Sequence, residues 1–166
     1  MADQTVNVVI AGLGGQGVLK ASDILADAAF RAGYDVKKAE VHGMSQRGGS
    51  VTTDVRYGST VYSPMVPPGR ADFLLVLEPT QVEPAGPRLA EEGLLINAGT
   101  IDPGDLPNAK ALNVAGLGML SVHLDLPPDT WQEAIRAALP EKVHDANMEA
   151  FAYGRARAGD TAGGNG

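Results

Sequence analysis

The apolar and polar positions of the chain alternate between strand-like and helix-like segments. Val6–Ala11 (VNVVIA) is an almost continuous apolar run, which is typical of a strand buried on both faces of a parallel sheet. From Val18 to Ala32 apolar residues recur at helical spacing, and Gly33 is placed to end that helix in a left-handed conformation. Asp35–Val41 follows as a second strand, so these segments together predict a βαβ unit.

The middle of the chain changes to strict alternation over Val51–Tyr57, and Gly58-Ser59 separates this run from Thr60–Tyr62, which predicts a β-hairpin. Phe73–Leu77 (FLLVL) predicts another buried parallel strand. The remaining predicted elements are a broken helix over Val82–Glu92, a strand over Leu94–Asn97, a closely packing glycine-bearing helix over Val114–His123, a helix over Trp131–Leu139 opened by a capping box at Thr130 and Glu133, and a helix over Val143–Ala158.

These elements predict an α/β fold: a Rossmann-like, mostly parallel sheet with a β-hairpin insertion and C-terminal helices. The 166 residues suit a single domain over residues 1–158. The glycine-rich segment 159–166 has nothing to bury and is expected to be a disordered tail.

Composition excludes several classes of function. A formal net charge of −7 argues against a nucleic-acid surface. The apolar stretches are too short to span a membrane and Met1–Asn7 lacks the features of a signal peptide, so we expect a soluble, cytoplasmic protein. Without a cysteine the chain can hold no disulfide, no cysteine-based zinc site and no ordinary iron–sulfur cluster. His42, His123 and His144 are scattered, and no metal site is expected.

The first candidate site is the glycine-rich stretch GLGGQG, which forms GxGxxG between the first strand and the first helix. The first glycine of the motif permits a tight turn, the second lets the backbone approach a phosphate, and the third lets the helix pack on the strand. The N-terminus of the helix then favours an anion, although the same glycines could simply make a turn. The candidate residues are Gly12, Gly14, Gly15, Gln16 and Gly17, with the Gln16 amide able to reach a ligand or a partner chain.

The second candidate is HGMSQRGGS, residues 42–50, which should neighbour the first because the ends of the first two parallel strands lie on the same side of the sheet. A surface rich in N–H groups and poor in side-chain bulk suits an anionic ligand or the backbone of another protein. Its candidate residues are His42, Gly43, Met44, Ser45, Gln46, Arg47, Gly48 and Gly49. Arg47 offers a positive fork suited to phosphate or carboxylate, although Arg47, His42 and Met44 also have structural explanations.

Glu40 stands where a dinucleotide enzyme places the acid that holds the ribose. No set of residues elsewhere in the chain resembles a hydride-transfer site. A strand-end surface acid therefore explains Glu40 at least as well.

Four motifs in consistent order resemble one family: GLGGQGV, VHGMSQRGGSV, ADFLLVLEP and LLIN, together covering about Val6–Asn97. They are similar to the gamma subunit or gamma domain of the 2-oxoacid:ferredoxin oxidoreductases, a group that includes pyruvate, ketoisovalerate, indolepyruvate and arylglyoxylate enzymes. The resemblance resumes over Asn113–Gly118 and Asn147–Gly154. It departs over residues 98–112, where the family usually has a longer strand and helix stretch.

The resemblance implies oxidative decarboxylation of a 2-oxoacid with coenzyme A to an acyl-CoA. It also implies that thiamine diphosphate, magnesium and iron–sulfur clusters reside in sister subunits, namely thiamine diphosphate-binding alpha and beta subunits and a ferredoxin-like subunit. This chain would hold no cofactor alone, contribute no catalytic residue, pack on the thiamine-binding subunits and help to frame the coenzyme A site. The alternatives are a stand-alone NAD(P)-binding oxidoreductase and a purely structural assembly subunit.

Overall fold

The computed structural model describes residues 4–42 and 49–164, with side chains described over 4–40 and 49–159. Its centre is a five-stranded sheet in the order β2-β3-β1-β4-β5. The strands are β1 (Val6–Leu13), β2 (Asp35–His42), β3 (Ser50–Gly58), β4 (Ala71–Val76) and β5 (Leu89–Asn97). The strand pairs β1–β4 and β4–β5 are parallel, whereas β3 is antiparallel to both β1 and β2. The sheet is therefore mixed, with β3 running against the other four strands, and the α/β prediction is confirmed.

The predicted hairpin was placed on the wrong strands. Thr60–Tyr62 forms no strand; the hairpin consists of β2 and β3, and β3 also separates β2 from β1, so the predicted βαβ unit does not consist of adjacent strands. β2 pairs with β3 along its whole length, from Asp35↔Gly58 to His42↔Val51. The full-length β2–β3 pairing contributes more cross-strand contacts than pairing with the three residues Thr60–Tyr62 could.

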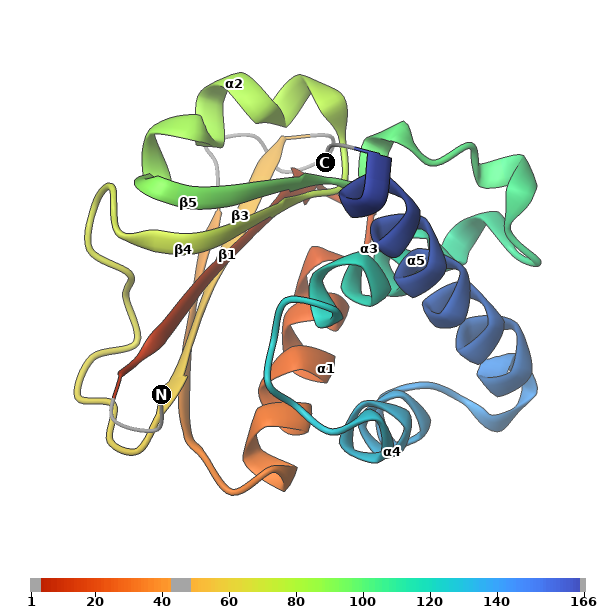
Figure 1. The fold of residues 1–166 in the computed structure, drawn as a ribbon, viewed down its shortest axis with the longest axis horizontal. Coiled ribbons are helices and arrows are strands. Elements are labelled where there is room, and N and C mark those ends of the chain that lie inside the picture. The colour runs from red at the N-terminus through yellow and green to blue at the C-terminus, as the bar shows by residue number, and fades with distance from the viewer. Residues whose placement is uncertain (1–3, 43–48, 165–166) are drawn as a thin grey trace.

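The helices cover the two faces of the sheet unequally. They are α1 (Val18–Arg31), α2 (Val82–Ala85), α3 (Leu112–Ser121), α4 (Pro128–Ala138) and α5 (His144–Gly164). Figure 1 shows α1, α3, α4 and α5 on one face and α2 on the other. Val8 and Ile10 of β1 face the larger core and Val9 and Ala11 the smaller one, all fully buried. The prediction that this first strand is buried on both faces is confirmed.

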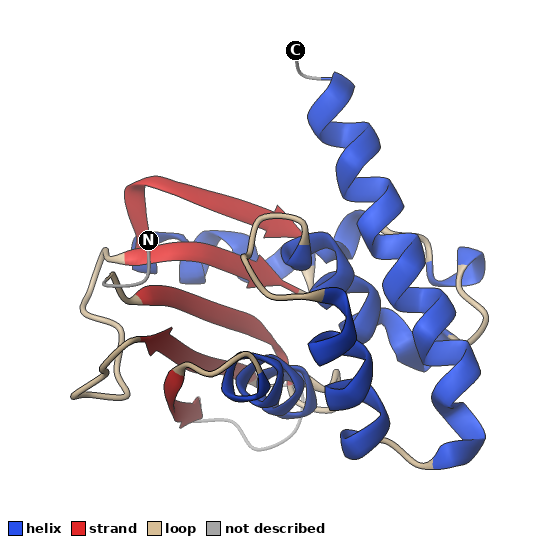
Figure 2. Ribbon diagram, turned by 60° about the horizontal axis from the view of Figure 1, so that its bottom comes forward, coloured by secondary structure: helices blue, strands red, loops and turns tan. Residues whose placement is uncertain are grey.

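The boundaries of the helices agree with the sequence in part. Gly33 has φ 98° and follows the last turn of α1, as predicted. The broken helix predicted over Val82–Glu92 ends earlier, since β5 begins at Leu89. The capping box is not formed: Pro127 is the N-cap of α4, and the Thr130 hydroxyl donates to its carbonyl. α5 continues to Gly164, into the segment predicted to be a disordered tail (Figure 2).

Segment 98–112 is held together by three consecutive 3₁₀ turns. The residue before each turn caps it, because its side-chain oxygen accepts the backbone N–H two residues later at 2.9 Å; these residues are Asn97, Asp102 and Asn108. α5 holds the segment from outside, through Tyr153 Oη donating to Asp105 Oδ2 at 3.3 Å and Arg157 Nη2 donating to Thr100 O at 3.2 Å. The short segment is thus a defined wall of the fold.

α3 and α5 cross in close backbone contact, and the predicted close packing of the glycine-bearing helix is confirmed. A Cβ atom at Gly118 would lie 2.2 Å from Phe151 O, and one at Gly154 would lie 1.9 Å from Ala115 O. Only glycine fits at these two positions, since a methyl group would meet backbone atoms. Among the described residues, no helix is both long enough and apolar enough to cross a membrane.

Candidate functional site

The β1–α1 turn lies where the strand order of the sheet reverses. From β1 the chain runs through α1 to β2 on one side, whereas β4 and β5 lie on the other side of β1. In open α/β sheets the carboxyl ends of the strands at such a switch point form the usual ligand crevice. Gly14 N donates to Gly49 O at 2.9 Å and Leu13 pairs with Ser50, so the two glycine-rich loops are neighbours, as predicted.

Three glycines of the turn, Gly12, Gly15 and Gly17, have separate steric reasons. Gly15 and Gly17 have φ values of 90° and 82°, in the left-handed region that favours glycine. A Cβ atom at Gly12 would lie 2.9 Å from Gln16 Oε1, so Gly12 makes room for that side chain. A Cβ atom at Gly17 would lie 2.5 Å from Asn113 Nδ2 of α3, and Asn113 donates to Gly17 O at 3.2 Å. The third glycine of the motif therefore admits a side chain from α3, where the sequence predicted contact with a strand.

The N-terminus of α1 carries no compensating group from its own sequence. Gly17 is its N-cap and offers no side chain, and the first turn of α1 contains no acidic residue. The backbone N–H groups and the positive end of the helix dipole remain suited to an anion there. Gly15 is exposed, and a Cβ atom at that position would meet no atom of the described residues within 4 Å.

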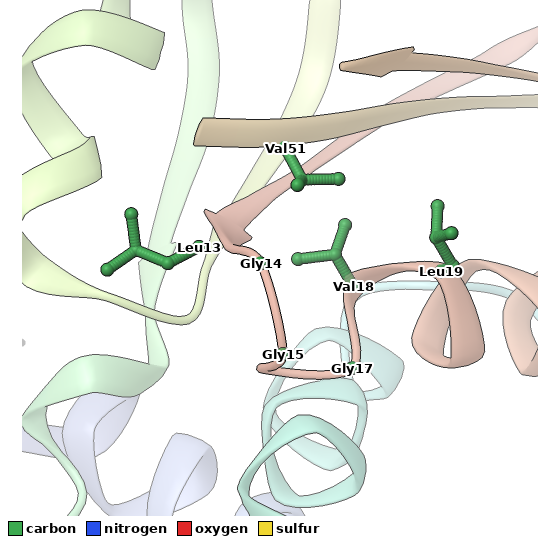
Figure 3. A pocket seen from close by; sticks show the side chains of 7 residues that line it. All are labelled: Leu13, Gly14, Gly15, Gly17, Val18, Leu19 and Val51. Carbon is green, nitrogen blue, oxygen red and sulfur yellow. The ribbon is translucent and has the colours of Figure 1, made fainter. Parts of the chain in front are cut away.

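Two depressions flank the turn. The first has a volume of about 320 Å³, and Figure 3 shows Val18 of α1 and Val51 of β3 beside its glycines; its lining residues are Leu13, Gly14, Gly15, Gly17, Val18, Leu19 and Val51. The second, of about 520 Å³, lies between the turn and segment 98–112; it is lined by Gly15, Gln16, Gly17, Ala109, Lys110 and Leu112. The side chains that line the first depression are apolar, while the second depression is lined in part by the positively charged Lys110.

Lys110 is a candidate that the sequence reasoning missed. Its side chain is exposed and has no ion-pair partner among the described residues. Asn108 fixes its backbone by accepting from Lys110 N at 2.9 Å. The sequence Asn-Ala-Lys just before a buried helix could have identified Lys110. An asparagine cap places the second residue after it near the N-terminus of the helix that follows.

Gln16 forms two hydrogen bonds within the chain. Its Oε1 accepts from Leu13 N at 2.7 Å, and its Nε2 donates to Glu78 Oε2 at 3.4 Å. Gln16 also borders the second depression, and its suggested reach toward a ligand or a partner chain stays a prediction. Glu78 follows β4 by two residues. It is a further residue at the carboxyl edge of the sheet that the sequence reasoning missed.

Most of the second loop lies outside the described residues. This applies to Gly43, Met44, Ser45, Gln46, Arg47 and Gly48, whose suggested contacts stay predictions. The His42 backbone pairs with Val51, and its side chain is not described. At the other end of the loop, Ser50 Oγ donates to Gln81 Oε1 at 2.7 Å, joining the loop to the connection after β4.

Glu40 does not occupy the ribose position of a dinucleotide site. It pairs with Thr53 across the β2–β3 ladder and lies 3.7 Å from Lys38 Nζ. Because β3 separates β2 from β1, Glu40 is one strand too far from the glycine turn for the role of ribose acid.

Two groups with shifted pKa values, Tyr57 and His123, lie toward the other end of the sheet. Burial raises the pKa of the Tyr57 phenol, and Tyr57 pairs with Val6 at the start of β1. Burial also lowers the pKa of His123, whose ring stacks on Phe73 near the start of β4. The described residues contain no cluster of three or more histidine, aspartate or glutamate side chains that could hold a metal ion. The described part of the turn therefore presents backbone N–H donors, and no cluster of side chains that could hold a metal ion.

Known proteins match this architecture. The family model for pyruvate ferredoxin/flavodoxin oxidoreductase matches residues 7–110. Indolepyruvate oxidoreductase subunit IorB of Thermococcus kodakarensis is 37% identical over 188 aligned positions, which cover 89% of this chain and 93% of the relative. Since the aligned positions outnumber the 166 residues of this chain, the relative carries residues that this chain lacks.

Two solved structures share the fold. The gamma subunit of a keto/oxoacid ferredoxin oxidoreductase from Geobacter sulfurreducens superposes with a TM-score of 0.77 at 23% identity, covering 92% of this chain and 98% of that one. A 2-oxoglutarate:ferredoxin oxidoreductase from Magnetococcus marinus, with 2-oxoglutarate, coenzyme A and succinyl-CoA bound, gives 0.83 at 21% identity and covers 95% of this chain. This chain spans 32% of the Magnetococcus chain.

Proposed function

The chain belongs to the pyruvate ferredoxin/flavodoxin oxidoreductase family, and on that basis we propose that it is the gamma-type subunit of a multisubunit, coenzyme A-dependent 2-oxoacid oxidoreductase. The assembled enzyme decarboxylates a 2-oxoacid, passes the acyl group to coenzyme A and delivers the electrons to a ferredoxin-type acceptor. The Thermococcus relative supports this assignment, since it is a subunit of an indolepyruvate oxidoreductase.

One observation carries the part played by this chain: the uncapped turn at Gly14–Gly17 beside Gly49. The phosphates of coenzyme A are anions, and they suit the first backbone N–H groups of α1, which no side chain caps. Gly15 leaves room among the described atoms for a ligand to approach the backbone. Lys110 on the wall of the larger depression adds a positive charge to a chain that is acidic overall.

The redox chemistry belongs to sister subunits in this proposal. Clusters bound by cysteine thiolates require cysteines, and this chain has none. Thiamine diphosphate and its magnesium would be held by alpha and beta subunits, and the clusters by a ferredoxin-like subunit. The gamma-type chain then contributes by orienting coenzyme A, which places the thiol where the acyl group is formed.

Indolepyruvate is the first 2-oxoacid to test, because the Thermococcus relative, 37% identical over 89% of this chain, is an indolepyruvate oxidoreductase subunit. The alternative of a stand-alone NAD(P) enzyme is not favoured. Its ribose-binding acid would have to be Glu40, and β3 separates that residue from the glycine turn.

The test is co-expression with candidate thiamine-binding and cysteine-rich subunits from the same genome, followed by purification. We expect the complex to reduce a viologen dye with indolepyruvate only when coenzyme A is present. The isolated chain should have no such activity and should contain neither iron nor thiamine diphosphate. Binding of NADH by the isolated chain, or turnover of the complex that is indifferent to coenzyme A, would contradict the proposal.

A further inference from the structure

We propose that the connection Glu78–Gln81, between β4 and α2, is a brace that positions the β1–α1 turn and the Gly49–Ser50 end of the second glycine-rich loop for the phosphate-bearing end of coenzyme A. The inference rests on the proposed function and goes beyond it, since Gln16, Glu78 and Gln81 become positioning residues that act through backbone N–H groups. The connection contacts one glycine-rich loop at each of its ends.

The first contact holds the β1–α1 turn. Gln16 Nε2 donates to Glu78 Oε2 at 3.4 Å, while Gln16 Oε1 accepts from Leu13 N at 2.7 Å. The side chain therefore closes the turn on itself and links it to the end of β4. The Gln16 amide has one donor end and one acceptor end, and both are needed.

The second contact holds the loop that ends at Ser50. Ser50 Oγ donates to Gln81 Oε1 at 2.7 Å, and Gln81 Nε2 donates to Thr80 Oγ1 at 3.3 Å. Gln81 is only 8% exposed, so losing this partner would leave a buried amide unsatisfied. Thr80 N donates in turn to Glu78 Oε1 at 3.5 Å, which makes the brace continuous from Gln16 to Ser50.

The connection itself is anchored on both sides. Leu77 N donates to Ala11 O at 2.9 Å, which ties its start to β1. Pro79 packs beneath Gly99 so closely that a Cβ atom there would lie 2.4 Å from Pro79 Cδ. Proline also fixes the backbone angle φ at that position.

Glycine loops need such support because they have no side chains to pack into a core. Among the described residues, the bond from Gly14 N to Gly49 O joins the two loops directly, just beyond the pairing of Leu13 with Ser50. The two side-chain contacts add fixed points on either side of it. A shift of the turn relative to Gly49 would move the N–H groups that the phosphates use, without touching the 2-oxoacid pocket of the sister subunits.

The experiment is a polarity swap across the first contact in the assembled enzyme. Gln16→Glu keeps an acceptor for Leu13 N but sets a carboxylate against Glu78, and like charges at this distance repel. Glu78→Gln is the companion variant: it brings no like charges together, but its one remaining oxygen cannot accept from both Gln16 Nε2 and Thr80 N as the two carboxylate oxygens do, so it should have an intermediate effect. In the double variant Gln16→Glu/Glu78→Gln, the new carboxylate at position 16 accepts from Leu13 N and from the new amide at position 78, so the contact is restored.

We expect Gln16→Glu to raise the Michaelis constant for coenzyme A about tenfold, the size of one lost hydrogen bond to a charged group. The constant for the 2-oxoacid should stay within about twofold. Glu78→Gln should lie between Gln16→Glu and the wild type, and the double variant should approach the wild type. An unchanged constant for coenzyme A in Gln16→Glu, even with a lower melting temperature, would overturn the brace. So would a double variant as impaired as Gln16→Glu.

A second pair of variants covers the other contact. Gln81→Leu removes the acceptor of the Ser50 hydroxyl, whereas Gln81→Glu retains one, so only the leucine variant should raise the constant for coenzyme A. Equal constants in these two variants would also count against the brace. The dependence of the wild-type enzyme on coenzyme A is measured first, since its absence would defeat the proposed function and not the brace.

Discussion

The crossing of α3 and α5 predicts a large difference between two identical substitutions in one helix. Gly154→Ala places a methyl group 1.9 Å from Ala115 O and 3.0 Å from Met119 N. Since ordinary contact begins near 3.4 Å, the helices must separate by about 1.5 Å or distort. Gly159→Ala adds the same methyl group to α5 where no atom lies within 4 Å.

The magnitude follows from two opposing terms. Overpacking against a fixed neighbour costs about 1–3 kcal/mol, and the upper end applies here because the obstacle is backbone. Alanine in place of glycine inside a helix stabilises the folded state by about 1 kcal/mol. Gly154→Ala should therefore lower the free energy of unfolding by about 2 kcal/mol, and Gly159→Ala should leave it unchanged or raise it by up to about 1 kcal/mol.

The assay is urea unfolding of the isolated chain, followed by fluorescence. The single tryptophan, Trp131, is fully buried and its ring lies 5.4 Å from that of Phe151 in α5, so its emission reports on this packing. The melting temperature of Gly154→Ala should fall by about 4–8 °C. If Gly154→Ala unfolds at the same urea concentration as Gly159→Ala, with equal slopes, the helices are not in backbone contact at this crossing.

Two further predictions concern stability. Gly15→Ala and Gly17→Ala both place alanine at positive φ, but only Gly17→Ala displaces Asn113 from its hydrogen bond to Gly17 O. Gly17→Ala should therefore lower the free energy of unfolding by about 1–3 kcal/mol more than Gly15→Ala, measured by thermal or urea unfolding. Equal losses in the two variants would mean that Asn113 contributes nothing to stability. Burial raises the pKa of the Tyr57 phenol in the folded chain above that of the unfolded chain, so its contribution to stability is complete below about pH 10 and is lost as the pH rises further. Tyr57→Phe removes a buried hydroxyl that has no hydrogen-bond partner among the described atoms. In urea titrations this variant should be at least as stable as the wild type at about pH 7, and its stability should depend less on pH above about pH 10. A steeper loss of stability at alkaline pH than in the wild type would contradict a raised pKa of Tyr57.

The sequence pattern predicted the elements well where burial alone decides them. Val6–Ala11 is apolar on both faces because it is a central strand of the sheet, with a core on each side. Gly33 ends α1 in the left-handed region because glycine meets no steric penalty there. The glycines of Val114–His123 predicted close packing, which Gly118 provides against the backbone of α5.

Pairing between distant segments was beyond the sequence pattern. Alternation over Val51–Tyr57 identified a strand, but it holds no information on whether the partner precedes or follows it. The partner is β2, and that choice places β3 between β1 and β2 and removes Glu40 from the glycine turn. The site was affected in the same way: the motif located the turn, whereas the inward bonds of Gln16 depend on Glu78, which lies 62 residues away in the chain.

A negative charge at position 15 tests most directly whether the β1–α1 turn receives coenzyme A. Gly15→Asn and Gly15→Asp add side chains of nearly the same shape, and both residues tolerate positive φ. A Cβ atom at this position meets none of the described atoms within 4 Å. They differ in a negative charge beside the N-terminus of α1. If this turn receives the phosphates of coenzyme A, the aspartate variant of the complex should have a Michaelis constant for coenzyme A about tenfold above that of the asparagine variant, with equal constants for the 2-oxoacid. Equal constants for coenzyme A in the two variants would contradict this role of the turn.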